Sequence, residues 1–190
     1  MNPILISEKM NAVEFLDHEF TEQELQEAWF ELMDGQMRKR NYPTILHQET
    51  SMNILRKIDA FVFEKKLGKV FHPPTGVILG EYHVVLPDLV FVSQANVGII
   101  QDTGIFGAPD LVVEIISPST LKDDRNDKKD LYAQFNIPEY WIIDPHYASI
   151  ELFEHTEKGY VLAGFAVESG KVVSKVLAGF EMEIQTVFVE

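Results

Sequence analysis

The segment from Leu111 to Ile116 reads LVVEII and is apolar except for Glu114. A strand that is apolar at nearly every position is one that the fold covers on both faces. This segment therefore predicts a central strand, opened by Asp110, in a sheet with other elements packed on both sides. It also places a carboxylate inside the core, where an ionised group is costly unless it has a partner.

The composition is that of an ordinary globular protein, because 46% of the 190 residues are hydrophobic and 24% are charged. This length suffices for one domain with a substantial core, and we expect a single domain over residues 1–190. The absence of cysteine excludes disulfides and thiolate metal sites and suits the cytoplasm. We expect no signal peptide at the N-terminus, and the apolar runs are too short to span a membrane.

The formal net charge of −14 argues against loose binding to nucleic acid, because Lys and Arg side chains that neutralise phosphates supply most of that affinity. A local basic patch remains compatible with this charge. The excess of carboxylates is also compatible with a divalent-metal site, although most of them must solvate the surface.

Proline, glycine and the periodicity of apolar residues divide the chain into helices and strands. Asp34-Gly35 marks the turn of a hairpin, and Gly68 ends a long amphipathic helix. The order favours an α/β (α+β) fold, with a mixed central sheet flanked by helices. The predicted elements are a helix over 7–20 capped by Ser7, a hairpin over 28–40, a helix over 44–67, strands over 69–72, 76–79, 84–92 and 109–117, a loop or short helix over 93–107, a helix over 121–136, a strand over 139–144, and an antiparallel meander of 149–154, 159–165 and 171–177.

Two carboxylates, Asp88 and Glu114, stand on apolar strands, and each needs a partner. An arginine, a lysine or a set of backbone N–H groups would give each carboxylate a structural role. A divalent cation shared by both would instead make them metal ligands, since Mg²⁺ prefers carboxylate oxygens completed by water and phosphate. Both interpretations stay open at this point.

Lys128 is a third candidate for chemistry. It lies in the charged helix that follows the Glu114 strand, and a short crossover would bring it over the end of that strand. There an ammonium could orient an attacking water or stabilise a phosphoryl oxygen. The alternative is a solvated helix face on which Lys128 pairs with Asp124, one turn earlier.

Two weaker candidates are Glu31, on the first hairpin, and His47, near the start of the long helix. The chain has no motif for a nucleophilic serine, a P-loop or a dinucleotide site, and its histidines lack a metal-binding spacing. Metal-assisted hydrolysis is therefore the reaction class that the sequence supports best.

Four segments in this order resemble a known family. They are FELMDG followed by His47, LPDLVFVS, GAPDLVVEIISPST and DDRNDKKDLYAQFNIPEYWIIDP. Together they are similar to the Uma family of putative restriction endonucleases, within the PD-(D/E)XK nuclease superfamily. The resemblance runs from about Met10 to the C-terminus and is most specific over residues 107–145. It implies a restriction-endonuclease-like mixed sheet flanked by helices, with the active site at one edge.

The resemblance also implies roles for individual residues. Asp88 is similar to the first metal-binding aspartate of the superfamily, and Glu114 to the acidic residue of the second half-motif. Glu31 resembles an additional metal ligand of the family, and His47 resembles a helix histidine that lines the site.

One position departs from the superfamily pattern. The usual lysine stands two residues after the second acid, where this chain has Ile116. Lys128 matches the lysine of the family's D-x-x-x-K-x-x-x-Y pattern, formed here with Asp124 and Tyr132. A flexible lysine stem can reach one point from different backbone positions, so the resemblance implies a catalytic lysine that has moved to the helix.

We therefore expect an Mg²⁺- or Mn²⁺-dependent endonuclease that hydrolyses DNA phosphodiester bonds. Along the DNA backbone we expect the basic clusters at residues 38–40 and 65–66. A homodimer is compatible with this activity, since cutting both strands requires two sites. Two alternatives remain open: a catalytically inactive, nuclease-like domain that binds metal, nucleic acid or protein, and an enzyme that acts on a small phosphate ester.

Overall fold

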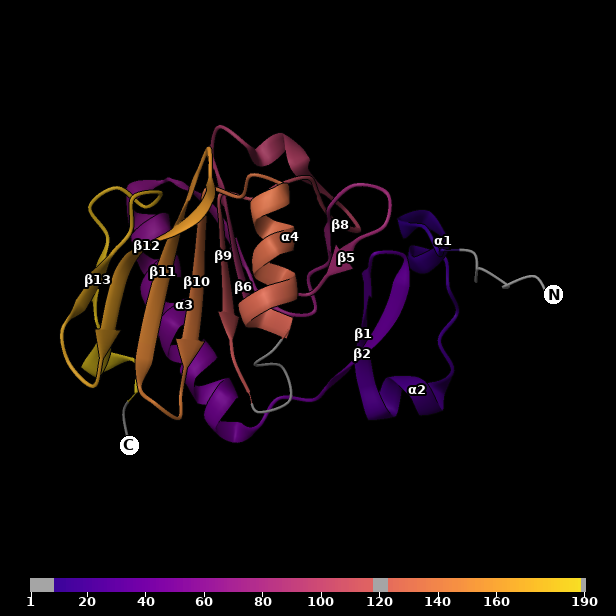
Figure 1. Ribbon diagram of the computed structural model, residues 1–190, viewed down its shortest axis with the longest axis horizontal. Coiled ribbons are helices and arrows are strands. Elements are labelled where there is room, and N and C mark those ends of the chain that lie inside the picture. Colours follow the sequence, from indigo (N-terminus) through magenta and orange to yellow (C-terminus); the bar gives the residue numbers. More distant parts are fainter. Residues whose placement is uncertain (1–8, 118–122, 189–190) are drawn as a thin grey trace.

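A six-stranded mixed sheet forms the centre of the computed structural model, which describes residues 9–117 and 123–188 (Figure 1). The strand order is β12-β11-β10-β9-β6-β3, and only the β9–β10 pair is parallel within this sheet. The strands are β3 (Gly68–Phe71), β6 (Leu89–Ser93), β9 (Leu111–Ile115), β10 (Glu139–Asp144), β11 (Ser149–Thr156) and β12 (Gly159–Val167).

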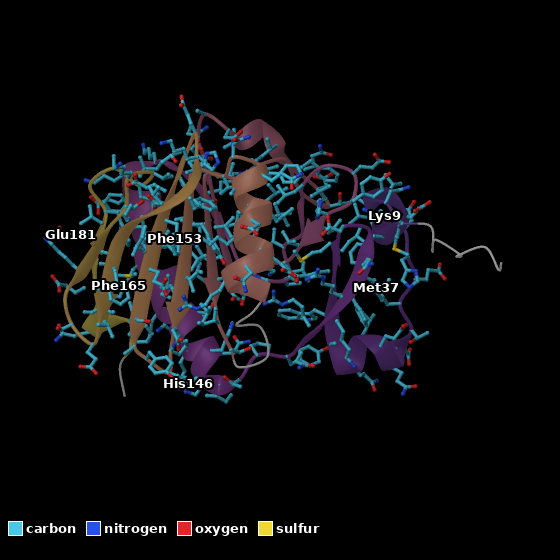
Figure 2. All side chains as sticks on the ribbon, in the orientation of Figure 1. Lys9, Met37, His146, Phe153, Phe165 and Glu181 are labelled. Atoms are coloured by element: carbon cyan, nitrogen blue, oxygen red, sulfur yellow. The ribbon has the colours of Figure 1, made fainter. Side chains whose placement is uncertain are left out.

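Helices cover both faces of this sheet, as the apolar β9 strand predicts. On one face, Ile54, Ile58 and Val62 of α3 (Ile45–Lys65) belong to the larger apolar core. On the other face, Leu131 and Tyr132 of α4 (Lys129–Gln134) belong to the second core cluster. Figure 1 shows α4 in front of the sheet and α3 behind it, and side chains fill the layers between them (Figure 2).

A second sheet lies beside α4, on the side of the molecule away from β12 and β13 (Figure 1). Its strand order is β2-β1-β5-β4-β8-β7. The strands are β1 (Ala28–Met33), β2 (Gln36–Asn41), β4 (Val77–Ile78), β5 (Val84–Val85), β7 (Ile100–Gln101) and β8 (Gly104–Phe106), with the short helix η1 (Val97–Ile99) before β7. Thus the segment 93–107, left open by the sequence, contains a short helix and a small hairpin.

The predicted first hairpin is confirmed. Asp34 and Gly35 have φ values of 53° and 74°, so both turn residues are left-handed, as a two-residue hairpin turn requires. Helix α3 begins after Thr44, whose hydroxyl accepts a hydrogen bond from the His47 amide at 3.3 Å. The helix ends at Lys65, and its C-cap Lys66 adopts the left-handed conformation. Gly68, which was expected to end the helix, is instead the first residue of strand β3.

The N-terminal helix is shorter than expected. Helix α1 spans Ala12–Leu16 and is capped by Asn11, while the expected cap Ser7 lies outside the described residues. A separate helix, α2 (Glu22–Glu27), follows and is capped by Thr21. Both helices have a capping box, in which the third helical residue is a glutamate that bonds back to the cap backbone.

Two predicted strands differ from the structure. The segment 84–92 is interrupted by Pro87, which lacks a backbone donor, and its halves β5 and β6 enter different sheets. The segment 171–177 does not extend the meander. Instead, β13 (Lys171–Val173) pairs with β14 (Glu181–Glu183) in a separate ribbon before the short helix η3 (Ile184–Thr186), because left-handed residues between β12 and β13 turn the chain away.

The predicted helix over 121–136 contains an irregular first turn. Residues Asp123–Lys128 form a π-helical turn, η2, that leads into α4. Such wide turns are rare and occur frequently at functional sites. None of the helices in the described segments combines the length and apolarity that a membrane crossing needs.

Candidate functional site

A cluster of charged side chains is buried where the two sheets meet the start of α4. We call it the ion cluster, and it consists of Glu31, Arg40, His47, Asp88, Glu114, Asp124 and Lys128. Both Glu114 and Asp124 have no exposed surface, and Lys128 is 1% exposed. The sequence analysis named five of these residues as site candidates, and the fold brings them together. They are Glu31, His47, Asp88, Glu114 and Lys128.

Asp88 directly precedes β6, and Glu114 lies on the adjacent strand β9. The last antiparallel pair of these strands joins Leu89 to Val113, so continuing the register by one step would place Asp88 opposite Glu114. The Ile115 amide donates a hydrogen bond of 2.7 Å to Asp88 Oδ2, which holds the carboxylate against the neighbouring strand.

His47 fixes Asp88 from the other side. Its Nε2 lies 3.2 Å from Asp88 Oδ2, and its Nδ1 is buried without a hydrogen-bond partner. Burial disfavours the charged form of both groups. Nevertheless, the hydrogen bond to Asp88 and its negative charge raise the pKa of His47. In turn, the hydrogen bond to His47 and its positive charge lower the pKa of Asp88. The pair is therefore stabilised as imidazolium and carboxylate.

Lys128 reaches two carboxylates at once. Its Nζ donates to Glu114 Oε1 at 2.7 Å and to Glu31 Oε1 at 3.0 Å, while Asp124 Oδ1 is 3.8 Å away. The expected crossover to the end of β9 is confirmed, and the pairing with Asp124 is the longer of the three contacts. Burial and Arg40 lower the pKa of Lys128, but the adjacent carboxylates outweigh them and raise it, so the ammonium stays charged.

Arg40 and Tyr132 complete the surroundings, although the sequence analysis gave neither a place in the site. Arg40 Nη1 lies 3.2 Å from Glu31 Oε2, and its Nη2 lies 3.8 Å from Glu114 Oε2. The Tyr132 hydroxyl donates to Glu114 Oε1 at 2.7 Å. Local sequence patterns could have indicated both residues. Arg40 is a diagonal neighbour of Glu31 in the hairpin register, and Tyr132 follows Lys128 by four positions, which is one helical turn.

The charge of the cluster depends on whether Glu114 carries a proton. Four carboxylates, Glu31, Asp88, Glu114 and Asp124, lie among three groups that can be cationic, Arg40, His47 and Lys128. Burial is the main cause that raises the pKa of Glu114 to about 8, and the charge of Asp124 adds to it while Lys128 opposes it. Its Oε2 atom is buried and accepts no hydrogen bond.

These donors fit a hard divalent cation. In the described part of the chain no three acidic or histidine side chains form a ready-made metal cage, because Lys128 lies between Glu31 and Glu114. Glu114 Oε2 accepts no hydrogen bond, although Arg40 Nη2 lies 3.8 Å away, so once Glu114 is ionised this oxygen could coordinate Mg²⁺ or Mn²⁺. Asp88, directly before β6, is a second carboxylate that such a cation could use.

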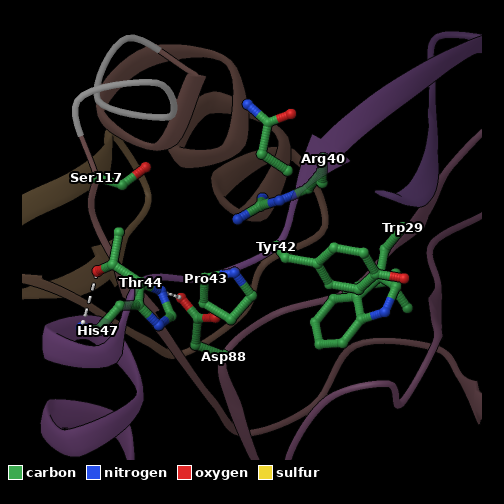
Figure 3. A pocket seen from close by; sticks show the side chains of 10 residues that line it. Trp29, Arg40, Tyr42, Pro43, Thr44, His47, Asp88 and Ser117 are labelled. Atoms are coloured by element: carbon green, nitrogen blue, oxygen red, sulfur yellow. Dashed lines mark hydrogen bonds and ion pairs between the residues drawn. The ribbon is translucent and has the colours of Figure 1, made fainter. Parts of the chain in front are cut away.

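A cleft leads to the cluster at Asp88 and His47 (Figure 3). It has a volume of about 190 Å³ and is also lined by Arg40, Trp29 and Tyr42. A second cleft of about 280 Å³ shares Trp29, His47 and Asp88 with the first. Asp88 is the one carboxylate among the described residues that line these clefts, so a ligand in either cleft would lie near it.

The basic clusters expected along DNA do not form one surface at the site, and their contact with DNA stays a prediction. Arg40 is turned into the ion cluster, with a side chain only 14% exposed, and Arg38 donates to Asp127 at 2.8 Å. Lys65 and Lys66 lie at the opposite end of α3 from His47, about 27 Å away by the rise of an α-helix. The hairpin cluster thus contributes charge to the site interior, and the second cluster lies far from it.

The comparisons with known proteins agree with this geometry. A family model, "Uma2: Putative restriction endonuclease", matches residues 13–185. Among solved structures, the crystal structure of a putative nuclease belonging to DUF820 from Anabaena variabilis ATCC 29413 has a TM-score of 0.75 to this chain. The two are 18% identical, over 94% of this chain and 97% of that chain, so the likeness concerns the fold. No curated protein matches. The mixed-sheet, nuclease-like fold expected from the sequence is confirmed.

Proposed function

The chain belongs to the Uma2 family of putative restriction endonucleases, and we propose that it is a metal-dependent endonuclease that hydrolyses DNA phosphodiester bonds. The observation that supports this most directly is the facing pair Asp88 and Glu114, with Lys128 Nζ 2.7 Å from Glu114 Oε1. We assign Asp88 and Glu114 as ligands of Mg²⁺ or Mn²⁺, with Glu31 as a further ligand.

A bound cation at these carboxylates supplies a Lewis acid for the phosphate and lowers the pKa of a bound water. The chain's own groups prepare the site for that chemistry. Tyr132 and Lys128 hold Glu114 by Oε1, which leaves Oε2 as the free donor. His47 and the Ile115 amide fix the orientation of Asp88.

Lys128 is the group assigned to the phosphate charge. Its ammonium stays protonated, and it adjoins Glu114, so it can stabilise the negative charge that develops on a phosphoryl oxygen during attack. Glu31 positions this ammonium, because its Oε1 accepts hydrogen bonds from both Lys128 and the Leu86 amide, at 3.0 and 2.7 Å. The lysine that the superfamily places two residues after the second acid is replaced here by one from the helix.

One observation favours a second candidate function, a nuclease-like domain that binds without cleaving. Lys128 occupies the space between Glu31 and Glu114, and the Oε1 atoms of both carboxylates are engaged with it. A cation could reach Glu114 only by its Oε2, unless the ammonium moved. In that case the domain would bind metal, nucleic acid or protein with Lys128 as a permanent structural partner of the two acids.

The deciding experiment measures cleavage of plasmid and single-stranded DNA with Mg²⁺ or Mn²⁺. We expect Asp88→Asn to abolish cleavage. Asp110→Asn is the matched control, because Asp110 is also a strand acid but bonds to the Ser93 amide at 2.7 Å and lines neither cleft. We expect Asp110→Asn to leave the cleavage rate of the folded protein unchanged.

Two outcomes would go against the proposal. Cleavage that survives Asp88→Asn would show that the site lies elsewhere. No cleavage by the wild type, together with a rise in Tm on adding Mg²⁺ that Asp88→Asn removes, would favour the non-cleaving domain. A homodimer, a cytoplasmic location and a single domain over residues 1–190 remain predictions, of which the first is tested by sedimentation of the purified chain.

A further inference from the structure

Two aromatic side chains line the clefts at the candidate site. Trp29 lines both clefts that contain Asp88 and His47, and Tyr42 lines the first. Their ring centroids are 5.9 Å apart at an interplanar angle of 78°, and Figure 3 shows them side by side. Tyr42 is 46% exposed, so its ring is accessible to a ligand.

Exposed apolar side chains lie close to these rings. Met52 of α3 lines the second cleft and is 44% exposed, and Leu46, next to His47 in α3, is 43% exposed. Exposed apolar groups that gather around a pocket mark a binding site for an apolar or aromatic group. The rings therefore suit a ligand that has both a flat apolar group, which would contact them, and a phosphate, which would lie near Asp88.

The charges near the clefts disfavour a double helix. Among the described residues that line the two clefts, Arg40 is the only arginine or lysine, and it is held by Glu31. The net charge of the chain is −14. Duplex binding depends on releasing counterions through many Lys and Arg contacts, whereas stacking of unpaired bases on aromatic rings needs far fewer.

We propose that Trp29 and Tyr42 form a stacking platform for an unpaired base, and that single-stranded DNA is the substrate of this site. The platform would take the base of a nucleotide whose backbone phosphate enters the cleft toward Asp88. This rests on the proposed nuclease function, which supplies DNA as the polymer. Stacking supplies the affinity that the scarce basic side chains do not.

Intrinsic fluorescence reports on the platform directly. The chain has two tryptophans, and Trp141 has no exposed surface, so quenching by an added oligonucleotide reports on Trp29. The titration uses the wild type in EDTA and in Ca²⁺, with a twelve-nucleotide oligo-dT, a duplex of the same length, and a U-rich RNA. We expect quenching by the oligo-dT at concentrations about tenfold below those that the duplex requires.

The variants isolate the two rings. We expect Trp29→Phe to remove the quenching while the emission of Trp141 remains, which reports an intact fold. By fluorescence anisotropy of labelled oligo-dT, Tyr42→Ala should weaken binding about tenfold, which is the usual effect of removing one stacked ring. Phe63→Ala is the matched control, because Phe63 is 83% exposed on α3 but lies four turns beyond His47.

Each contrary result has a distinct meaning. Equal or tighter binding of the duplex, or unchanged binding by Tyr42→Ala and Trp29→Phe, would overturn the platform. RNA that binds as tightly as oligo-dT would overturn the assignment to DNA. Quenching that depends on protein concentration alone would show that a second copy of the chain covers the clefts. This result would also overturn the proposed stacking platform. Platform-dependent binding without cleavage in Mg²⁺ would support the platform while refuting the nuclease proposal.

Discussion

Two glutamates are fully buried on neighbouring strands of the central sheet, Glu114 on β9 and Glu139 on β10, and their surroundings are opposite. Glu139 accepts four hydrogen bonds from neutral donors. The donors are the Trp141 indole at 2.8 Å, the Ser174 hydroxyl at 2.7 Å, and the amides of Lys175 and Val176 at 2.9 and 3.3 Å. Glu114 has two donors on one oxygen and none on the other.

The difference shows what separates a structural acid from a candidate ligand. Both oxygens of Glu139 are satisfied, so it ties β10 to the loop after β13 and has no capacity left for a cation. Glu114 lies among Lys128, Asp124, Arg40 and Asp88 and keeps one oxygen without a hydrogen bond, so that oxygen is available as a ligand. Burial alone does not distinguish the two.

The largest expected difference is in catalysis. Glu114→Gln should lower Mg²⁺-dependent DNA cleavage about a thousandfold, because metal polarisation contributes several kcal/mol to such reactions. Glu139→Gln should leave the rate per folded molecule unchanged. Single-turnover cleavage at matched concentrations of folded protein tests both. Similar losses in the two variants would mean that the contrast between the glutamates is structural only.

The next effect is on stability, and here the substitution of Glu139 should have the larger effect of the two. Glu139→Gln replaces one acceptor oxygen by an NH₂ group, which leaves buried donors without a partner and should cost about 3 kcal/mol of unfolding free energy. Glu114→Gln should cost less, since one of the Glu114 oxygens has no donor to lose. Urea unfolding in EDTA measures both values. A larger loss in Glu114→Gln would contradict this ranking.

The third effect, which is the smallest when counted per pH unit, is a pH dependence of stability. Because burial raises the pKa of Glu114 to about 8 from an ordinary value of 4.5, the folded chain keeps a proton that the unfolded chain loses between these values. The stabilisation is therefore complete below the unfolded pKa and declines as pH rises through 8, by at most about 1.4 kcal/mol per pH unit.

The measurement is urea unfolding in EDTA across this pH range. Glu114→Gln should have a flatter profile than the wild type, because the titrating group is gone, and Glu139→Gln should keep the wild-type slope. Parallel profiles for the wild type and Glu114→Gln would show that another group in the cluster binds the proton.

Most of the fold could be predicted from local sequence patterns. Alternation and apolar runs identified β9 and its two covered faces, and Asp34-Gly35 identified the first hairpin. Patterns of this kind depend on neighbours within a few residues. The split of 84–92 between two sheets depends on pairing partners that are distant in sequence. The departure of β13 from the meander depends on left-handed residues before it, and periodicity alone showed neither.

The candidate site divides in the same way. Asp88, Glu114 and Lys128 could be identified because acids and a lysine next to apolar strands stand out, and because their order resembles a family. Arg40 was misjudged as a DNA contact, since a basic run on a hairpin is usually solvated. Its inward turn depends on Glu114 and Asp124, more than seventy positions away, to which no local signal connects it.

The hydrogen bond between Glu31 and Lys128 joins residues 97 positions apart, from the first hairpin and from the turn before α4. During synthesis the ribosome produces the hairpin early and the lysine much later. A nascent chain therefore contains the acids of the ion cluster before it contains the ammonium. The cluster can be complete only after both segments have been made and have packed together in the fold.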